Sequence, residues 1–256
     1  MEIIAHRGAS YDAPENTLSS VNLAWRQNAD AVEVDVQFSR DRRMVVIHDD
    51  NTRKIAGVRK KVCEQTLAQL KALDIGRWKH PRWQGESMAT LEEVLATVPA
   101  GKRLFVEIKC GSECVAEFKR AFDRSGKGAE QLVVIGFGLD TMKLIKQRLH
   151  ELEVCWIAEF KRNWTTGGWS PKPGTLIEKA KHAGLDGLDL GARGINPALV
   201  EEIKAADFSL YVWTVDSPAQ AKKLKKAGVD GVTTNRPGWL REQLEKDSTD
   251  GKHSSA

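Results

Sequence analysis

The chain has 256 residues, near the typical length of one (β/α)8 barrel, and its 39 basic and 35 acidic residues give a formal net charge of +4. The basic residues are interleaved with acidic ones and form no block, so we expect no nucleic-acid partner. No stretch approaches the ~20 apolar residues that cross a bilayer, and the first residues lack a secretory signal, so we expect a cytoplasmic protein without a membrane span.

Short β-branched or apolar runs recur along the chain, each followed by a segment with helical spacing. This alternation is typical of parallel βα units, and eight such units predict an α/β fold, a (β/α)8 TIM barrel. We expect residues 1–246 to form this single domain and the polar segment 247–256 to be a disordered tail. The predicted strands are Ile3–Ala5, Ala31–Val36, Leu104–Ile108, Leu132–Ile135, Val154–Ala158, Gly187–Leu190, Leu210–Val215 and Gly231–Thr233.

Several of the intervening helices have recognisable first turns. Pro14 suits a first helical turn, because its ring fixes φ near the helical value. Thr90 and Glu93 have the spacing of a capping box, in which the two side chains accept hydrogen bonds from free backbone N–H groups. Asn196-Pro197 and Ser217-Pro218 each place a capping side chain ahead of a proline. Each signal predicts where a helix begins.

One further apolar run, Met44–Ile47, follows the second strand too closely for a parallel crossover, which needs a dozen or more residues. It is therefore predicted to return antiparallel as a hairpin. If Arg40 pairs with Arg43, the same register sets Asp35 opposite His48. A one-residue slip would still leave His48 level with the acidic part of the strand.

The hairpin begins a segment, about residues 39–88, that interrupts the βα alternation. Helical spacing from Leu67 to Leu73 predicts one short helix within it. We expect this segment to be a small insertion after the second strand. In a barrel such an insertion belongs to the βα loops at the C-terminal face, where active sites lie.

Acidic residues interrupt two strands that should be buried. Glu33 and Asp35 point the same way, because side chains alternate along a strand, and so do Glu107 and Lys109 on another strand. Two like charges about 4 Å apart repel by roughly 4 kcal/mol at an effective dielectric near 20, so the carboxylates require compensation. A hard divalent cation, Mg2+ or Ca2+, prefers such oxygen ligands. The alternative is an ion-pair network with Arg7 and Lys109.

Two histidines flank the same carboxylates, since His6 follows the first strand and His48 ends the hairpin. A lone histidine at a strand end is more often a packed or surface residue than a catalyst. Two of them at one site suit general acid and base catalysis. The other histidines have no such partners and are interpreted as surface residues: His80, His150, His182 and His253.

Eight short motifs occur in order along nearly the whole chain, from Ile3 to about Gly238. They are His6-Arg7-Gly8, Pro14-Glu15-Asn16-Thr17, Glu33-Val34-Asp35-Val36, Val45-Val46-Ile47-His48-Asp49, Thr90-Leu91-Glu92-Glu93, Val106-Glu107-Ile108-Lys109, Val212-Trp213-Thr214-Val215 and Thr234-Asn235-Arg236-Pro237. In order and spacing they closely resemble the motifs of the glycerophosphodiester phosphodiesterase family. His-Arg-Gly alone would be a weak signal, whereas eight motifs in register are specific.

The resemblance implies hydrolysis of a small-molecule glycerophosphodiester to sn-glycerol 3-phosphate and an alcohol. In that chemistry the substrate's own 2-hydroxyl attacks phosphorus, and water then opens the cyclic phosphate. The implied cofactor is one divalent cation, Mg2+ or Ca2+, and its implied ligands are Glu33, Asp35 and Glu107. The other implied site residues are the catalytic His6 and His48, the phosphate-binding Arg7 and Lys109, Asn16 near the site, and Trp213 as an apolar wall beside the glycerol.

The chain also departs from the family pattern. Arg40-Asp41-Arg42-Arg43 replaces the family's usual Asp-Gly hairpin turn, and Met88-Ala89 replaces its common Ile-Pro. The segment Phe160–Pro173, with Trp164 and Trp169, matches none of the motifs. Its aromatic and basic residues suit either a lid over the site or a packed structural loop.

Three other functions are compatible with parts of this pattern. The same fold and cation could serve a phospholipase D-like or C-like enzyme acting on a lysophospholipid or an inositol-type head group. Lys109 could instead form a Schiff base in an aldolase barrel. A binding module that kept the cation and lost catalysis would lack a histidine or a ligand, and none is missing here.

Overall fold

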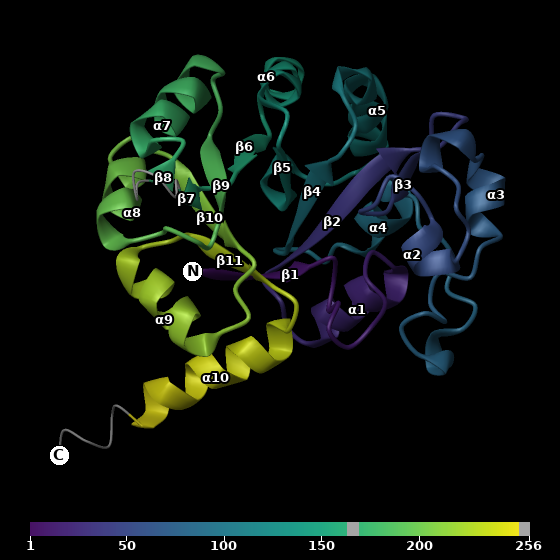
Figure 1. Cartoon of the computed structure of the whole chain (residues 1–256), viewed down its shortest axis with the longest axis horizontal. Helices are drawn as coiled ribbons and strands as arrows, with labels where there is room; N and C mark the ends of the chain where they lie inside the picture. Colours follow the sequence, from purple (N-terminus) through teal and green to yellow (C-terminus); the bar gives the residue numbers. More distant parts are fainter. Residues whose placement is uncertain (163–168, 251–256) are drawn as a thin grey trace.

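The computed structural model describes residues 1–162 and 169–250. Eight of its strands are β1 Glu2–His6, β2 Ala31–Phe38, β4 Arg103–Ile108, β5 Leu132–Gly136, β6 Glu153–Ala158, β9 Gly187–Gly191, β10 Ser209–Trp213 and β11 Gly231–Thr234. These strands pair in parallel in this order, and β11 pairs back with β1 to close the barrel (Figure 1). The predicted (β/α)8 barrel is confirmed, and each predicted strand overlaps one of these eight.

Helices surround the barrel and connect successive strands (Figure 1). They are α1 Leu18–Arg26, α4 Leu91–Thr97, α5 Val115–Ser125, α6 Leu139–Arg148, α7 Pro173–His182, α8 Pro197–Lys204, α9 Pro218–Ala227 and α10 Pro237–Asp250. Three predicted helix starts are confirmed, because Thr90 and Glu93 form a capping box and the side chains of Asn196 and Ser217 cap α8 and α9. In the described residues, no helix is both long and apolar enough to cross a membrane.

The predicted helix start at Pro14 is wrong. Helix α1 begins at Leu18, and the side chain of Thr17 caps it by accepting a hydrogen bond from Ser20 N. The cause lies at Asn16, whose φ of 59° is in the left-handed region and cannot continue a right-handed helix. The residues before Thr17 are therefore free to form a loop at the mouth of the barrel.

Two apolar layers hold the barrel. The inner layer fills its interior and includes Phe105 and Tyr211, whose rings pack edge to face with centroids 4.8 Å apart. The outer layer lies between strands and helices and includes Val34, Val106 and Leu188. Because side chains alternate along each strand, residues such as Glu33 and Glu107 must point to the inside. The inner apolar layer therefore forms the bottom of the cavity, and the polar side chains lie above it.

The predicted hairpin is confirmed, but its predicted register is wrong by one residue. Strand β3 (Met44–Val46) runs antiparallel to β2 and places Val46 opposite Val36, so Ile47, and not His48, is level with Asp35. The turn explains the difference. Ser39 N donates to Arg43 O, and Arg42 adopts a left-handed φ of 57°, which is the geometry of a three-residue turn and not of the expected two-residue turn.

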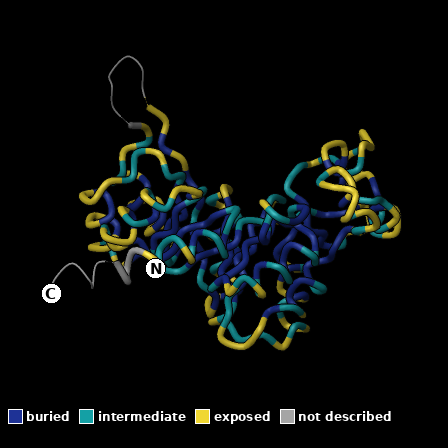
Figure 2. The backbone as a smooth tube through the Cα atoms, turned by 90° about the horizontal axis from the view of Figure 1, so that it is seen from below, coloured by how far each residue is buried: buried dark blue, intermediate teal, exposed yellow. Residues whose placement is uncertain are grey.

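The rest of the insertion after β2 folds on a small core of its own, which includes Val62, Leu70, Ile75 and Met88. Its elements are α2 Arg53–Ala56, η1 Val62–Glu64, α3 Leu67–Lys71 and η2 Pro81–Trp83. Helix α3 confirms the short helix predicted here. The insertion projects from the barrel at the right of Figures 1 and 2, and its Lys79 Nζ donates to Ser10 O in the loop after β1.

Two predicted segments lie partly outside the described residues. Within Phe160–Pro173, the strands β7 (Lys161–Arg162) and β8 (Trp169–Ser170) pair antiparallel, whereas Trp164 falls among the residues that are not described. In the predicted tail, helix α10 extends to Asp250, and residues 251–256 are not described.

A polar cluster closes the N-terminal end of the barrel, opposite the insertion. Arg103 forms ion pairs with Glu2 and Glu153, and Glu153 also accepts a hydrogen bond of 2.8 Å from the hydroxyl of Tyr211. These side chains come from β1, β4, β6 and β10 and tie distant strands together. In a barrel, polar residues at this face serve stability, because catalysis takes place at the other end.

We predict that Arg103→Met lowers the free energy of unfolding by about 2–3 kcal/mol, because it leaves two partly buried carboxylates without their cation. Turnover by the folded protein should not change. Urea unfolding and an activity assay at 25 °C test both statements. Arg120→Met, which removes an exposed arginine of α5, is the control and should cost under about 0.5 kcal/mol. A variant that lost activity and kept its stability would contradict this assignment.

Candidate active site

A cavity of about 100 Å³ opens at the C-terminal ends of the strands. Its lining consists of His6, Arg7, Glu33, His48, Glu107, Lys109, Ile135, Phe137, Ile157, Asp189, Trp213 and Thr233. The lining includes seven of the nine residues that the sequence analysis proposed for the site. The other two, Asn16 and Asp35, contact each other through a hydrogen bond of 2.8 Å from Asn16 Nδ2 to Asp35 Oδ2. The structure therefore brings all nine together.

The His-Arg-Gly motif forms a tight turn directly after β1. Arg7 and Gly8 have φ values of 56° and 78°, and a Cβ atom on Gly8 would lie 2.5 Å from Ser20, so only glycine fits there. The turn aims Arg7 N at Glu33, whose Oε2 accepts a hydrogen bond of 2.9 Å. Asn16 N donates to Arg7 O and holds the turn in place. Two left-handed non-glycine residues, Arg7 and Asn16, thus lie together at the site.

Three carboxylates crowd the cavity wall, because oxygen atoms of Glu33, Asp35 and Glu107 all lie within 4.8 Å of one another. At that distance two ionised groups repel by about 3–4 kcal/mol at an effective dielectric near 20. Burial, together with the charges of Asp35 and Glu107, raises the pKa of Glu33 well above its ordinary value. Burial and Asp35 raise the pKa of Glu107 to about 7. Only Asp35 keeps a lowered pKa.

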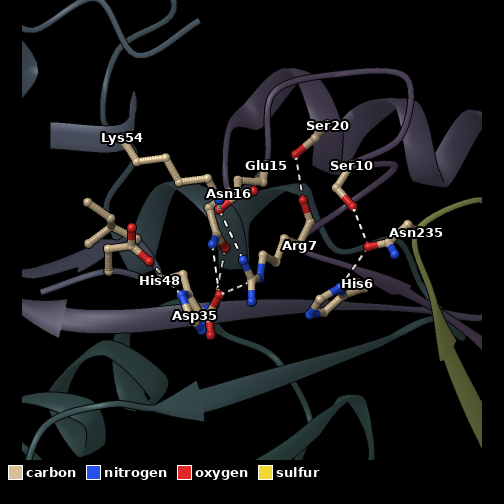
Figure 3. A network of polar contacts seen from close by, with 12 residues as sticks. His6, Arg7, Ser10, Glu15, Asn16, Ser20, Asp35, His48, Lys54 and Asn235 are labelled. Atoms are coloured by element: carbon tan, nitrogen blue, oxygen red, sulfur yellow. Dashed lines mark hydrogen bonds and ion pairs between the residues drawn. The ribbon is translucent and has the colours of Figure 1, made fainter. Parts of the chain in front are cut away.

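Two basic side chains explain why Asp35 stays ionised. Although burial opposes it, Lys109 and Arg7 lower the pKa of Asp35 by lying 3.1 Å from its two carboxylate oxygens. Lys109 Nζ also lies 2.6 Å from Glu107 Oε1. Behind them, Glu15 bridges Arg7 and Lys54, and Lys54 belongs to helix α2 of the insertion (Figure 3). The insertion is therefore linked electrostatically to the site.

The donor set fits one hard divalent cation. Glu33 Oε1 is buried and has no hydrogen-bond partner among the described residues, so it is available as a ligand. The alternative of a pure ion-pair network is incomplete, because two cationic side chains face three carboxylates. Adding a divalent cation gives two plus two positive charges against three negative ones, which leaves one positive charge. A phosphodiester monoanion would neutralise that charge.

A hydrogen-bonded chain orients His6 (Figure 3). The carboxylate of Asp216 can only accept, so the Asn235 amide must turn its Nδ2 toward Asp216, at 2.7 Å, and its Oδ1 toward His6. His6 Nδ1 lies 2.8 Å from that Oδ1 and must carry its proton there. The other ring nitrogen, Nε2, is then a free acceptor in the neutral ring. Burial and the charge of Arg7 lower the pKa of His6, which favours this neutral form.

His48 is oriented by a carboxylate of its own loop. Its Nδ1 lies 2.8 Å from Asp49 Oδ1. The loop itself is fixed by Gln37 of β2, whose Nε2 donates to His48 O at 2.8 Å and to Asp49 O at 2.7 Å. Both histidines therefore have Nδ1 occupied by an oxygen acceptor, which leaves both Nε2 atoms for chemistry.

Sequence reasoning missed two residues of the site. Asn235 belongs to a motif that was recognised but given no role. Asp189 lines the cavity and is only 2% exposed, and burial together with Glu107 raises its pKa well above the ordinary value. The signal for Asp189 was available, because an acidic residue inside a buried parallel strand is as unexpected here as at Glu33.

Comparison with known proteins finds one consistent relationship. A family model described as the glycerophosphoryl diester phosphodiesterase family matches residues 6–239. The Bacillus subtilis protein YhdW is 30% identical over 260 residues, and the alignment covers 100% of both chains. A glycerophosphodiester phosphodiesterase of Caldanaerobacter subterraneus is 28% identical over 249 residues, which cover 93% of this chain and 95% of that protein.

Solved structures agree with this relationship. An Oleispira antarctica phosphodiesterase in complex with the product sn-glycerol-3-phosphate matches with a TM-score of 0.84 at 27% identity, covering 96% of this chain and 97% of that one. A structure from Silicibacter pomeroyi also has a TM-score of 0.84, at 22% identity, and covers 97% of this chain and 94% of its own. At that lower identity the match shows the shared fold alone.

We predict that Glu107→Gln stabilises the cation-free protein above neutral pH. The pKa of Glu107 rises from an ordinary 4.5 to about 7 on folding, so ionising it costs stability as the pH increases between these values. In chelator at pH 8, the variant should gain about 1–3 kcal/mol in free energy of unfolding, measured with urea. At pH 4 the gain should vanish. Glu245→Gln, on the exposed surface of α10, is the control, and equal gains in both variants would contradict the prediction.

We predict that Asn235→Ala lowers kcat about 10–100-fold, because His6 loses the acceptor that fixes its tautomer and ring orientation. KM should change little, since Asn235 does not line the cavity. Ser10→Ala is the matched control, because Ser10 Oγ donates to the same Asn235 oxygen without touching His6. Equal kcat values for the two variants would show that Asn235 does not act through His6.

Proposed function

Because the chain belongs to the glycerophosphoryl diester phosphodiesterase family, and hydrolyses glycerophosphodiesters, we propose that it does so with one divalent cation and two histidines. The products would be sn-glycerol 3-phosphate and an alcohol. The observation that carries the proposal is the convergence of three carboxylates, two basic side chains and two histidines on one mouth of the barrel.

The cation would be Mg2+ or Ca2+, held by Glu33, Asp35 and Glu107. When bound, such a cation polarises a phosphoryl oxygen and lowers the pKa of a bound hydroxyl. Arg7 and Lys109 face the same space and would stabilise the negative charge that develops on the phosphoryl oxygens. Asn16 would act indirectly, by holding Asp35 through two hydrogen bonds.

The two histidines would move the protons. Neutral His6, with its Nε2 free, suits the base that takes the proton of the substrate's 2-hydroxyl. As that oxygen bonds to phosphorus, the bond to the departing alcohol breaks, and His48 would give the alcohol a proton. The resulting cyclic phosphate would be opened by water with the two roles exchanged. Trp213 lines the cavity as an apolar wall and would pack against the glycerol carbons.

The structure bears on the alternatives. Although burial opposes it, Asp35 and Glu107 raise the pKa of Lys109, so its amine stays protonated and cannot attack a carbonyl. A permanently charged amine argues against the aldolase alternative. A lysophospholipid or inositol-type substrate would use the same charged groups and differs only in the parts of the substrate beyond the phosphate.

The test is release of sn-glycerol 3-phosphate from glycerophosphocholine and glycerophosphoethanolamine in a coupled assay. We expect activity that chelator abolishes and that Mg2+ or Ca2+ restores, together with a melting temperature that falls and recovers in parallel. His6→Ala and His48→Ala should each lower turnover about 10²–10⁴-fold with cation binding retained in calorimetry. His182→Ala, an exposed residue of α7, is the control.

Three results would contradict the proposal. Activity that is indifferent to chelator would remove the cation from the mechanism. Unfolding of both histidine variants would indicate structural roles for His6 and His48. Release of phosphocholine in place of sn-glycerol 3-phosphate would mean that a different bond is cleaved.

A further inference from the structure

Asp189 is a buried acid in the active-site cavity with no assigned task. Its side chain is 2% exposed, and its Oδ1 has no hydrogen-bond partner among the described residues. A buried polar group without a partner costs roughly 1–3 kcal/mol, so a partner for this oxygen would stabilise the protein. Because Asp189 lines the cavity, the missing partner can come from a ligand.

The strand order places Asp189 across the barrel from the carboxylate cluster. Strand β9, which carries Asp189, is four strands away from β2 in either direction around the ring of eight. Glu33 and Asp35 therefore lie on one wall and Asp189 on the opposite one. A substrate whose phosphate lies among the charged groups would direct its far end toward Asp189.

The surroundings of Asp189 leave room for a small polar group. Of its inward-facing neighbours on β9, Gly187 is packed against Ser209 O and Cys155 Sγ, whereas Gly191, on the side of the mouth, has no side chain and leaves the room. Register partners on the adjacent strands are Ile157 and Tyr211, and Trp213 lies one inward position beyond Tyr211. Asp189 is thus a single acidic side chain on a mostly apolar wall of the cavity. Such an arrangement fixes the orientation of a small ligand.

We propose that the carboxyl group of Asp189 binds the terminal hydroxyl of the glycerol moiety and selects deacylated glycerophosphodiesters. This inference rests on the proposed function and deepens it. The hydroxyl next to the phosphate must lie near His6 and the carboxylate cluster, so the terminal hydroxyl is the one that reaches the opposite wall. A 1-acyl lysophospholipid carries an ester in place of that hydroxyl, so it has no proton to donate to Asp189 Oδ1 and also brings an acyl chain to the same place.

The environment of Asp189 supports a neutral hydrogen-bonding role. Burial and the nearby charge of Glu107 raise the pKa of Asp189 well above the ordinary value. A neutral acid does not repel a phosphodiester anion, and it can both donate to and accept from a hydroxyl. Asp189 is not among the carboxylates grouped closely enough to share the cation, which are Glu33, Asp35 and Glu107 in the described part of the chain.

The experiment compares two substrates that release choline. One is glycerophosphocholine, and the other is 2-hydroxypropyl phosphocholine, which keeps the hydroxyl next to the phosphate and lacks the terminal one. We expect the unmodified enzyme to prefer the first by about 10–100-fold in kcat/KM, because the second leaves a buried oxygen of Asp189 without a partner. Asp189→Val should abolish this preference by lowering kcat/KM for glycerophosphocholine alone. Asp189→Asn should keep most of the preference, because an amide also binds a hydroxyl.

The outcomes separate this inference from the proposed function. If the unmodified enzyme releases choline from both substrates equally, Asp189 does not recognise the terminal hydroxyl and the inference is overturned. The proposed phosphodiesterase function is not affected by this result. If Asp189→Val lowers kcat/KM equally for both, its role is structural or catalytic and the inference is overturned. No turnover of either substrate by the unmodified enzyme would instead count against the proposed function. Calorimetry then still tests Asp189, because sn-glycerol 3-phosphate should bind the unmodified protein more tightly than 1,2-propanediol phosphate.

Discussion

The active site depends on a balance of charge at one mouth of the barrel. Asp35 is fully buried and is shared by Arg7 and Lys109, while Glu33 and Glu107 stand within 4.8 Å of it. No arrangement of these five groups alone neutralises all three acids. Burial, together with that deficit, raises the pKa values of Glu33 and Glu107, and the proposed divalent cation would supply the missing positive charge.

A comparison of the two ends of the barrel separates a functional cluster from a structural one. At the N-terminal end, the side chains of Glu2 and Glu153 keep 30% and 23% exposure, so water screens them and Arg103 suffices as a partner. At the C-terminal end, Asp35 is 0% and Glu107 11% exposed. Both ends hold more acids than bases. Only at the buried C-terminal end is the repulsion between the carboxylates left unscreened, and this destabilising arrangement is explained by function.

The sequence predicted most of the fold and the main chemistry, because both leave periodic signals. Alternating apolar runs gave eight strands, and charged residues within those runs marked Glu33, Asp35 and Glu107. The errors arose where a backbone angle decides the outcome. The left-handed conformations of Asn16 and Arg42 moved the start of α1 and shifted the hairpin register by one residue. Asn is enriched in this conformation but not restricted to it, and Arg is not enriched, so neither residue type was a sufficient signal.

Asn235 escaped prediction for a different reason, since its role depends on contacts between residues more than 200 positions apart, and these arise only when β11 closes against β1. Asp189 had a local signal, an acidic residue in a buried strand, but its place in the cavity becomes apparent only in the closed barrel.

The proposal assigns different roles to the two walls of the cavity, because charge attraction and hydrogen bonding differ in range. Electrostatic attraction acts over several ångströms and depends little on shape, so the wall with Arg7 and Lys109 would attract any phosphodiester. Discrimination among diesters needs a short-range contact, because a hydrogen bond fails when its partner is missing or displaced. On the opposite wall Asp189, which lies beside Gly191 and an apolar surface, would provide the proposed contact. In this proposal, affinity for phosphate and selectivity for glycerol belong to different strands and could change independently.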